Sequence, residues 1–380
     1  MATSGDVLGL TERLSGLVLP EGLVREACRP VEFRQPGFDQ LFDSKTLVYD
    51  AVLVPEDQTV VLTCPPALNL QAQWQAAEFF DAASGQRLTF ELIELDRVLR
   101  VVVQGTSKNT TSIKIAFDGR NYQLDVRDRD TSAFHDKKVL MTVSKDNDIS
   151  WIVDWAEYYS RVHAIDSVLL LDNNSQRYSR DALLERLVAV PGISLVHVVD
   201  WPFPWGPTAG PNSVWDSNFG QHGAFEVCRW RFLRDAALVV NADVDELVIP
   251  RAGTNLFEFC SKSSLGAACY GGRWVINAEG LTPEGHERRH RNYFHVMPRQ
   301  SPLSMAKWAV QPKRTKRVKQ WLTHRLQGLG TEPYTEDFEL GHYREISTNW
   351  KWKRASKPAD WQDATLDAGI LNVFRSIGWR

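Results

Sequence analysis

Apolar runs and amphipathic segments alternate in the middle of the chain, and this alternation restricts the fold more than any other feature. The runs at 138–144, 167–172 and 193–199 have the length and β-branched content of buried strands. The segments 149–162 and 181–188 lie between them and carry apolar residues at helical spacing. A β-α-β-α-β order implies a mainly parallel sheet wound by right-handed crossovers. We therefore expect a Rossmann-like α/β domain here.

The sequence before this domain has a different hydrophobic pattern. Short stretches between residues 46 and 130 alternate as strands do, and Asp118-Gly119 fits a two-residue hairpin turn. Short alternating strands separated by turns predict a small antiparallel β-sandwich domain. Prolines interrupt residues 1–45, which we interpret as an irregular lead-in. The predicted division is a β-rich domain at 1–135, the α/β domain at 136–355 and a C-terminal tail at 356–380.

Composition limits the class of protein. The 380 residues carry a formal net charge of −3 and a pI near 6.3, which argues against a nucleic-acid partner. A membrane span would need about 20 consecutive apolar residues, and no such stretch occurs in the sequence. The five cysteines are widely spaced without a Cys-x-x-Cys pair, and the first residues do not resemble a signal peptide. These features predict reduced thiols and a cytoplasmic location.

Three strand ends in the α/β domain are polar in the same way. Residues 144–148 read Ser-Lys-Asp-Asn-Asp, residues 172–175 read Asp-Asn-Asn-Ser, and residues 243–246 read Asp-Val-Asp-Glu. Because the carboxyl ends of parallel strands meet at one edge of a sheet, a single nucleotide could contact all three. Asp243 and Asp245 could hold a divalent cation on its diphosphate. Solvated turns often have the same composition, so the residues alone leave both interpretations open.

Further residues follow in a recognisable order. Gln221 lies in the predicted helix before the acidic motif, and Lys307 begins a basic, tryptophan-rich part of the chain after it. The C-terminal part then contributes His324, His342, Tyr343, Arg344, Ser347 and Lys351. Together with the three strand ends, this set over residues 138–355 resembles the GT-A glycosyltransferases. The resemblance is closest to glycosyltransferase family 92 and the family 2-like group.

The resemblance implies metal-dependent, inverting transfer of a sugar from a nucleotide sugar to the hydroxyl of a saccharide or other acceptor. Uridine diphosphate is the favoured carrier, and Mn²⁺ or Mg²⁺ would be the cofactor. Donor binding is then expected at Ser144, Lys145, Asn147, Asp172, Asn174, Gln221, Asp243, Arg344 and Lys351. Metal binding is expected at Asp243, Asp245, His342 and His324. Two positions depart from the family pattern, because Asn147 replaces a common acid and Leu247 a common phenylalanine.

Within the acidic motif, the resemblance favours Asp245 as the direct metal ligand and Asp243 as a ribose contact or a ligand through water. Side-chain alternation along a strand would point Glu246 away from both, so we expect it to hold the loop. An inverting transfer also needs a base that takes the acceptor proton. A further strand is predicted at 270–276. Glu279, which follows it, is the first candidate and Glu284 the second, although either could be a solvated loop carboxylate.

Other interpretations remain open on sequence alone. A transferase domain that has lost activity could serve as a carbohydrate-binding or scaffold protein. Nucleotidyl transfer also uses paired carboxylates, but no Gly-rich phosphate loop follows the first strand. Trp201, Trp205 and Trp215 could stack on a sugar or pack their own loop. The basic run at 313–319 is expected to form a solvated face or to approach the diphosphate, and the chain could form a homo-oligomer.

Overall fold

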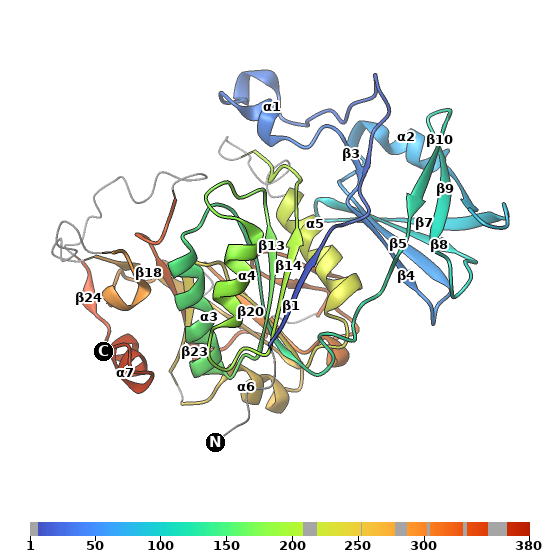
Figure 1. The fold of residues 1–380 in the computed structure, drawn as a ribbon. Helices are drawn as coiled ribbons and strands as arrows, with labels where there is room; N and C mark the ends of the chain where they lie inside the picture. Colours follow the sequence, from blue (N-terminus) through green and yellow to red (C-terminus); the bar gives the residue numbers. More distant parts are fainter. Residues whose placement is uncertain are drawn as a thin grey trace.

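The computed structural model describes residues 7–207, 219–251, 253–277, 287–301, 305–329, 333–348 and 363–380. The described chain has two lobes (Figure 1). A β-rich lobe contains most of the residues before 130, and an α/β lobe contains most of the rest. The polar strand ends that were predicted to form a site lie in the α/β lobe.

The α/β lobe is built on a seven-stranded sheet in the order β1-β14-β13-β12-β15-β20-β17. Its first five strands run parallel, and β20 is antiparallel to both of its neighbours. The predicted mainly parallel α/β sheet is therefore confirmed. The strands are β1 (Leu8–Glu12), β12 (Lys138–Ser144), β13 (Ser167–Asp172), β14 (Leu195–Asp200), β15 (Leu238–Asn241), β17 (Ala267–Tyr270) and β20 (Lys307–Val310).

Helices cover both faces of this sheet, because its central strands bury side chains on both sides. They are α3 (Ile149–His163), α4 (Arg180–Val188) and α5 (Phe219–Val227), the last continued by a π-helical turn at Cys228–Phe232. Alternate side chains of β13 face one core shared with α3 and α4 and a second core shared with α5. Asp148 and Ser179 begin α3 and α4, where their side chains accept hydrogen bonds from backbone N–H groups.

The lead-in is not wholly irregular. Leu8–Glu12 forms β1, which pairs with β14 at the edge of the main sheet, and β2 (Leu17–Val18) pairs with β3 (Thr46–Val48). A short helix, α1 (Phe38–Leu41), follows in the same segment. The prediction of an irregular lead-in is wrong for β1, because a partly exposed edge strand of five residues carries too little apolar pattern to be recognised.

A second sheet of five strands has the order β16-β23-β18-β19-β24. The strand predicted at 270–276 is confirmed as β18 from Gly272 onward, but its predicted start is two residues too early, because Tyr270 still belongs to the main sheet. Gly272 is required there, since a Cβ atom would lie 2.7 Å from the Leu340 carbonyl oxygen. The strands are β16 (Glu246–Pro250), β18 (Gly272–Ile276), β19 (His295–Val296), β23 (Phe338–Tyr343) and β24 (Thr365–Leu366).

The C-terminal segment that was predicted as a tail contains a helix, α7 (Ala368–Ser376), which packs with β16. Ile370 and Phe374 of this helix are buried in the core shared with α3. Just before it, the Asp367 carboxylate forms ion pairs with Arg251 at 2.7 Å and Arg273 at 2.8 Å. A further helix, α6 (Leu256–Lys262), lies between β16 and β17 in the chain.

The β-rich lobe contains one hydrogen-bonded series of eight strands in the order β10-β9-β6-β7-β8-β5-β4-β11. The two separate layers of the predicted sandwich are not confirmed. The predicted hairpin is confirmed, because Asp118 and Gly119 both have positive φ between β9 and β10. The elements are β4 (Asp50–Val54), β5 (Thr59–Cys64), β6 (Glu78–Asp81), β7 (Arg87–Leu95), β8 (Val98–Gln104), β9 (Ser112–Phe117), β10 (Arg120–Asp125), β11 (Arg127–Asp128) and α2 (Gln71–Gln75).

Buried ion pairs fix the two lobes against each other. The Arg100 guanidinium of β8 donates to the Glu226 carboxylate of α5 at 2.6 Å. Arg231 in the π-helical turn donates to both carboxylate oxygens of Asp50 in β4, at 3.0 and 2.9 Å. Because all four groups are buried, each charge depends on its partner for compensation.

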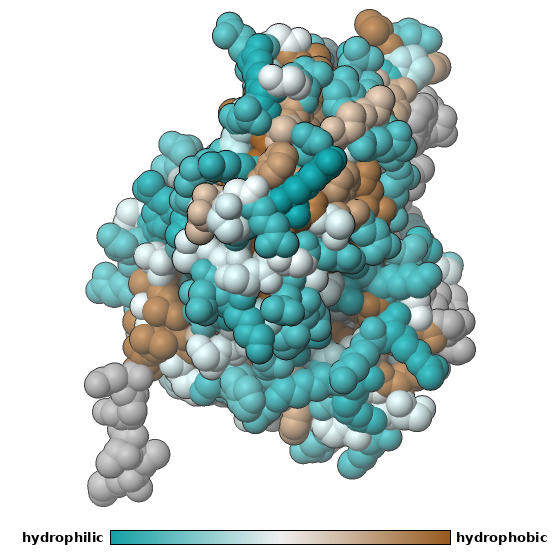
Figure 2. Space-filling model, turned by 90° about the vertical axis from the view of Figure 1, so that its right-hand side faces the viewer, coloured by the Kyte–Doolittle hydropathy of each residue, from teal (hydrophilic) through white to brown (hydrophobic). Residues whose placement is uncertain are grey.

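The face shown in Figure 2 is mainly hydrophilic, and its hydrophobic side chains form separate patches. All five cysteines are free thiols, and only Cys28 is exposed. Among the described residues, none of the helices combines the length and the apolar character that crossing a bilayer requires.

Candidate active site

The acidic motif forms a tight turn between the two sheets of the α/β lobe. β15 ends at Asn241, and β16 begins at Glu246. The Glu246 N–H donates to the Asp243 carbonyl at 3.0 Å, and the Asp243 N–H donates to the Glu246 carboxylate at 2.8 Å. The prediction that Glu246 points away from the other acids is wrong, because side-chain alternation holds only within a strand and these residues form a turn.

A buried lysine neutralises part of this charge. The Nζ atom of Lys307, from β20, lies 2.9 Å from the Asp243 carboxylate and 3.1 Å from that of Glu246. The Lys307 side chain is 0% exposed. Burial opposes its charge, but Asp243 and Glu246 outweigh this effect and raise the pKa of Lys307 above its ordinary value. Lys307 therefore stays protonated at neutral pH.

Strand pairing brings a histidine to the same turn. Glu246 in β16 lies directly opposite His342 in the antiparallel partner β23. The Nε2 atom of His342 lies 3.0 Å from the Asp245 carboxylate, and the Trp274 ring covers the imidazole at a centroid distance of 4.2 Å. One donor atom from each of Asp245, Glu246 and His342 lies within 4.8 Å of the other two. Two carboxylates and an imidazole in this arrangement suit a divalent cation.

Burial is the largest influence on Glu246 and raises the pKa of its carboxyl to about 7. The positive charge of Lys307 lowers this pKa, whereas repulsion from Asp243 raises it. At neutral pH this carboxyl therefore binds a proton, or a cation in its place, more readily than an exposed glutamate does. This is the electrostatic property expected of a cation-binding site.

Two of the predicted metal ligands lie outside this group. Asp243 is engaged by Lys307, and His324 is exposed with its Nδ1 atom 2.9 Å from the Ala306 carbonyl oxygen. In the part of the chain that the structure describes, the group that could hold a metal ion comprises Asp245, Glu246 and His342. The geometry thus brings together two of the four predicted ligands and adds Glu246.

The end of β13 lies on the same edge of the main sheet. Asp172 is partly exposed, and its carboxylate accepts hydrogen bonds from the Ser175 N–H at 3.2 Å and the Ser175 hydroxyl at 2.5 Å. Burial raises the pKa of Asp172 in spite of these bonds. Asn174 is exposed with a φ of 56°, which is the left-handed conformation that a tight turn requires.

The end of β12 lies between those of β13 and β15. Ser144 pairs with Asp172 across the strands, and the Asn147 amide donates to the Ser144 hydroxyl at 2.9 Å. The Asp146 N–H donates to the Ser175 hydroxyl at 2.9 Å, which joins this turn to the end of β13. Lys145 is partly exposed in the same turn. The predicted meeting of the three polar strand ends at one edge is therefore confirmed.

Gln221 is buried in α5. Its side-chain oxygen accepts a hydrogen bond from the Thr323 hydroxyl at 3.1 Å, and the Asn241 amide donates to the Thr323 carbonyl at 3.0 Å. These contacts tie α5 and the segment before His324 to the end of β15. They give Gln221 a structural contact, while its predicted role in donor binding stays a prediction.

Comparison with known proteins decides the family. The sequence profile of glycosyltransferase family 92 matches residues 141–369, which is more than half of the chain. The chain belongs to glycosyltransferase family 92. The matched region contains all three possible metal ligands, Lys307 and the ends of β12 and β13.

Among solved structures, an active-site mutant of LgtC is similar, with 13% sequence identity and a TM-score of 0.27. The similarity covers 47% of this family 92 chain and 59% of the LgtC chain, so the chain spans less than two thirds of that relative. No curated protein matches the sequence.

Several predicted residues of this family 92 protein fall elsewhere. Arg344 follows β23 and is partly buried. Glu279, Glu284 and Lys351 lie outside the described residues, as does Trp215. Their predicted roles as catalytic bases, phosphate contact and sugar contact therefore stay predictions.

Burial decides one alternative that the sequence left open. Trp201 and Trp205 are 0% and 7% exposed, so they pack their loop against the family 92 domain. In the basic run, Arg314 donates to the carbonyl oxygens of Cys260 and Ser261 at the end of α6. Arg314 thus completes a helix C-terminus.

Sequence reasoning missed how Glu246 and Lys307 act together. A single lysine within the apolar β20 was the available signal, because a charged residue in a buried strand requires a partner of opposite charge. Asp243, one of the partners of Lys307, lies 64 positions away in the chain, so local sequence could not identify it.

Proposed function

We propose that this family 92 protein transfers a sugar from a nucleotide sugar to an acceptor hydroxyl, with inversion at the anomeric carbon and a divalent cation. The donor is a uridine diphosphate sugar, and the acceptor is a saccharide or another hydroxyl compound. The observation that carries the proposal is the group of possible metal ligands, Asp245, Glu246 and His342, at the carboxyl edge of the parallel sheet. Nucleotides bind at this edge in α/β folds.

The residues of the turn would have three different roles, in metal binding, charge balance and ribose contact. Asp245, Glu246 and His342 would hold Mn²⁺ or Mg²⁺, which when bound supplies positive charge to the departing diphosphate. Lys307 orients the Asp243 carboxylate and limits the net negative charge of the turn. Asp243 then contacts the ribose of the nucleotide, as the resemblance suggests for this position.

The ends of β12 and β13 would receive the nucleoside. Asp172 presents a partly exposed carboxylate that can accept hydrogen bonds from a base or a ribose. Ser144 and Asn147 hold the neighbouring turn in shape. The base that removes the acceptor proton is proposed to be Glu279, with Glu284 as the second candidate.

An Asp245→Asn substitution tests the proposal because it removes the charge and keeps the shape of the side chain. Release of uridine diphosphate from a panel of uridine diphosphate sugars should fall at least about hundredfold, in line with the loss of a major electrostatic contact. Calorimetry with Mn²⁺ should show the loss of cation binding in the same variant.

Asp200→Asn is the matched control. Asp200 ends β14 at the same edge, but its carboxylate is paired with Arg180 at 2.9 Å. This variant should retain turnover and Mn²⁺ binding. Retained Mn²⁺-dependent transfer in Asp245→Asn would contradict the proposal, and absence of uridine diphosphate and Mn²⁺ binding in the unmodified protein would favour the inactive carbohydrate-binding alternative.

A further inference from the structure

A cavity of about 180 Å³ lies in the α/β lobe, away from the acidic turn. Its walls come from the π-helical turn that continues α5 and from the segment that follows β20. Strand pairing gives its position, because Val310 at the end of β20 lies opposite Val239 near the start of β15. Arg234 precedes β15, and Pro312 and Lys316 follow β20. The cavity therefore lies at the edge where the parallel strands begin, opposite the edge that carries the acidic turn.

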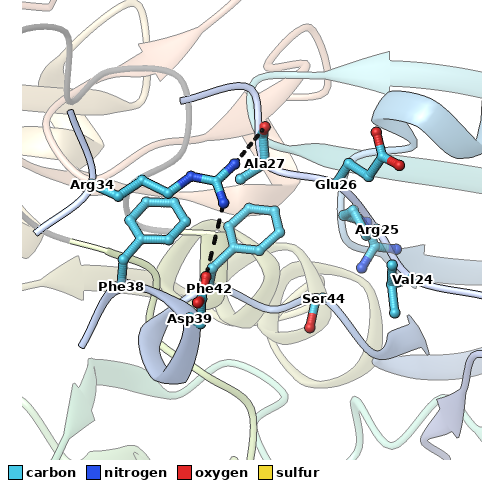
Figure 3. A pocket seen from close by; sticks show the side chains of 9 residues that line it. All are labelled: Val24, Arg25, Glu26, Ala27, Arg34, Phe38, Asp39, Phe42 and Ser44. Atoms are coloured by element: carbon cyan, nitrogen blue, oxygen red, sulfur yellow. Dashed lines mark hydrogen bonds and ion pairs between the residues drawn. The ribbon is translucent and has the colours of Figure 1, made fainter. Parts of the chain in front are cut away.

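The wall of this cavity is cationic. It contains Arg229, Arg234 and Lys316, and no carboxylate lines it among the described residues. The cavity of the lead-in segment in Figure 3 differs, since its lining contains two arginines and also two acids, Glu26 and Asp39. The whole chain has a net charge of −3, so the cationic wall is a local feature. A cleft lined by one sign of charge concentrates ions of the opposite sign.

One indole ring holds the guanidinium groups together. The Cζ atoms of three arginines lie near the centre of the Trp230 ring, at 5.1 Å for Arg100, 5.7 Å for Arg229 and 5.5 Å for Arg234. Contact with the ring offsets part of the repulsion among these charges. Burial lowers the pKa of Arg229 to about 10. Glu226 opposes this effect, and the positive charges of Arg100 and Arg234 add to it.

The Glu226 carboxylate does not belong to one arginine alone. It lies 3.9 Å from Arg229, but it is buried and accepts hydrogen bonds from Arg100 at 2.6 Å and from the Trp230 indole at 2.7 Å. Its charge is therefore shared between two guanidinium groups, and an anion in the cavity would relieve the repulsion that remains.

Arg234 and Lys316 can be reached from solvent and have unused donors. The Arg234 side chain is 41% exposed and forms no hydrogen bond with the rest of the described chain. Its ion pair with Glu56 is 3.9 Å long, and Glu56 also pairs with Arg129. The side chain of Lys316 is exposed and has no ion pair or hydrogen bond among the residues that the structure describes. A ligand that enters the cavity can therefore contact N–H donors of both side chains.

A phosphate group matches the chemistry and the size of this cavity. A guanidinium offers paired N–H donors to phosphate oxygens, and a lysine ammonium adds a compact positive charge. The cavity is smaller than the roughly 300–1,000 Å³ of pockets for drug-sized ligands, so it suits a single phosphate group better than a nucleotide. A free phosphate and the headgroup of an anionic lipid present the same oxygens.

We propose that this cavity binds a phosphate group through Arg234 and Lys316. The proposal does not depend on the transferase function, because neither residue belongs to the proposed donor or metal site. The basic run at 313–319 would then contribute a cation to a second binding site, separate from the acidic turn.

Calorimetric titration of the full chain with inorganic phosphate at fixed ionic strength tests the site. Arg234→Gln and Lys316→Gln should each weaken binding at least about tenfold, because each removes a charge-assisted hydrogen bond. Arg317→Gln is the matched control, since Arg317 is exposed in the same run and does not line the cavity. It should bind phosphate as the unmodified protein does. Thermal unfolding of each variant verifies that it is folded.

Vesicle sedimentation distinguishes the two sources of the phosphate. Vesicles of phosphatidylglycerol carry an anionic headgroup, whereas those of phosphatidylcholine have no net charge. Sedimentation with phosphatidylglycerol vesicles alone would assign the site to a lipid headgroup, provided that Arg234→Gln and Lys316→Gln abolish it. Binding of inorganic phosphate without sedimentation would assign it to a free phosphate.

Three results would overturn the proposal. The first is that the unmodified protein binds neither inorganic phosphate nor phosphatidylglycerol vesicles. The second is that folded Arg234→Gln and Lys316→Gln bind as well as the unmodified protein. The third is an equal loss of binding in Arg317→Gln, which would show attraction by the charge of the whole basic run instead of recognition in the cavity.

Discussion

The ends of β15 and β13 lie on the same edge of one sheet, yet different forces hold their side chains in place. At β15 the carboxylates of Asp243 and Glu246 are balanced by the buried charge of Lys307. At β13 the Asp172 carboxylate is held by hydrogen bonds from Ser175 and by no ion pair among the described residues. The first end depends on charge balance, and the second depends on the shape of its turn.

This difference indicates how the two ends would respond to a ligand. The β15 end retains a carboxyl that needs a proton or a cation, so binding there is linked to pH and to metal. The β13 end is satisfied by its own loop and partly open to solvent, so it can accept a polar ligand with little electrostatic change. Three experiments test this contrast, in order of decreasing expected effect.

Lys307→Met should have the largest effect on stability. It leaves Asp243 and Glu246 without their cation, and breaking a buried ion pair from one side costs about 3–5 kcal/mol. Urea unfolding without metal measures this loss. Adding Glu246→Gln to Lys307→Met should recover part of it, because one uncompensated charge is removed.

Lys138→Met is the control for this substitution. Lys138 is 25% exposed and 4.0 Å from Asp166, so its loss should cost less than about 1 kcal/mol. If Lys307→Met were as stable as the unmodified protein, charge balance would not hold the β15 end.

Mn²⁺ affinity should depend on the protonation of Glu246. The pKa of this carboxyl is raised to about 7, so the proton competes with metal below that pH. Affinity measured by calorimetry should fall about fivefold from pH 7 to pH 6 and level off above pH 8. Glu246→Gln should flatten this dependence, and an unchanged slope in that variant would contradict the assignment.

The same group gives a matching trend in stability without metal. Because its folded pKa is raised above the unfolded value of 4.5, its stabilising contribution is complete below pH 4.5 and is lost as the pH rises through about 7. Saturating Mn²⁺ should remove this loss, since the cation replaces the proton.

Ser175→Ala should have the smallest effect. It removes the hydroxyl that donates to Asp172 and accepts from Asp146, which should cost about 1 kcal/mol in urea unfolding. Mn²⁺ affinity should not change, because the β13 end does not share the charge balance of the β15 end. Ser132→Ala, an exposed hydroxyl bonded only locally to Asp130, should cost less than about 0.5 kcal/mol. A change in Mn²⁺ affinity with Ser175→Ala would show that the two ends are coupled.

The central strands and helices could be predicted from sequence because several local signals agree there. β12 and β13 are buried on both faces, so they appear as continuous apolar runs. Asp148 marks the start of α3 by its capping side chain. Placing the polar residues at the ends of these strands then followed from the parallel topology alone.

Other features depend on partners that are distant in the chain. The run at 270–276 was predicted as one strand, but Tyr270 pairs with β20 and the residues from Gly272 onward pair with β23, and only the three-dimensional structure separates them. β1 gains its strand character from β14. The Glu246 carboxylate faces the turn because it accepts a hydrogen bond from the Asp243 N–H, whereas side-chain alternation along a strand predicted that it would point away from Asp243 and Asp245.

The antiparallel pairing of β16 with β23 has a consequence for folding. It joins Asp245 to His342, which are 97 positions apart, so their contact forms only after a long loop has closed. In the unfolded chain only the neighbours Asp245 and Glu246 remain close. A divalent cation would therefore favour the native chain by mass action. Capture of Mn²⁺ during refolding would report the moment at which β23 docks, without any need for a substrate.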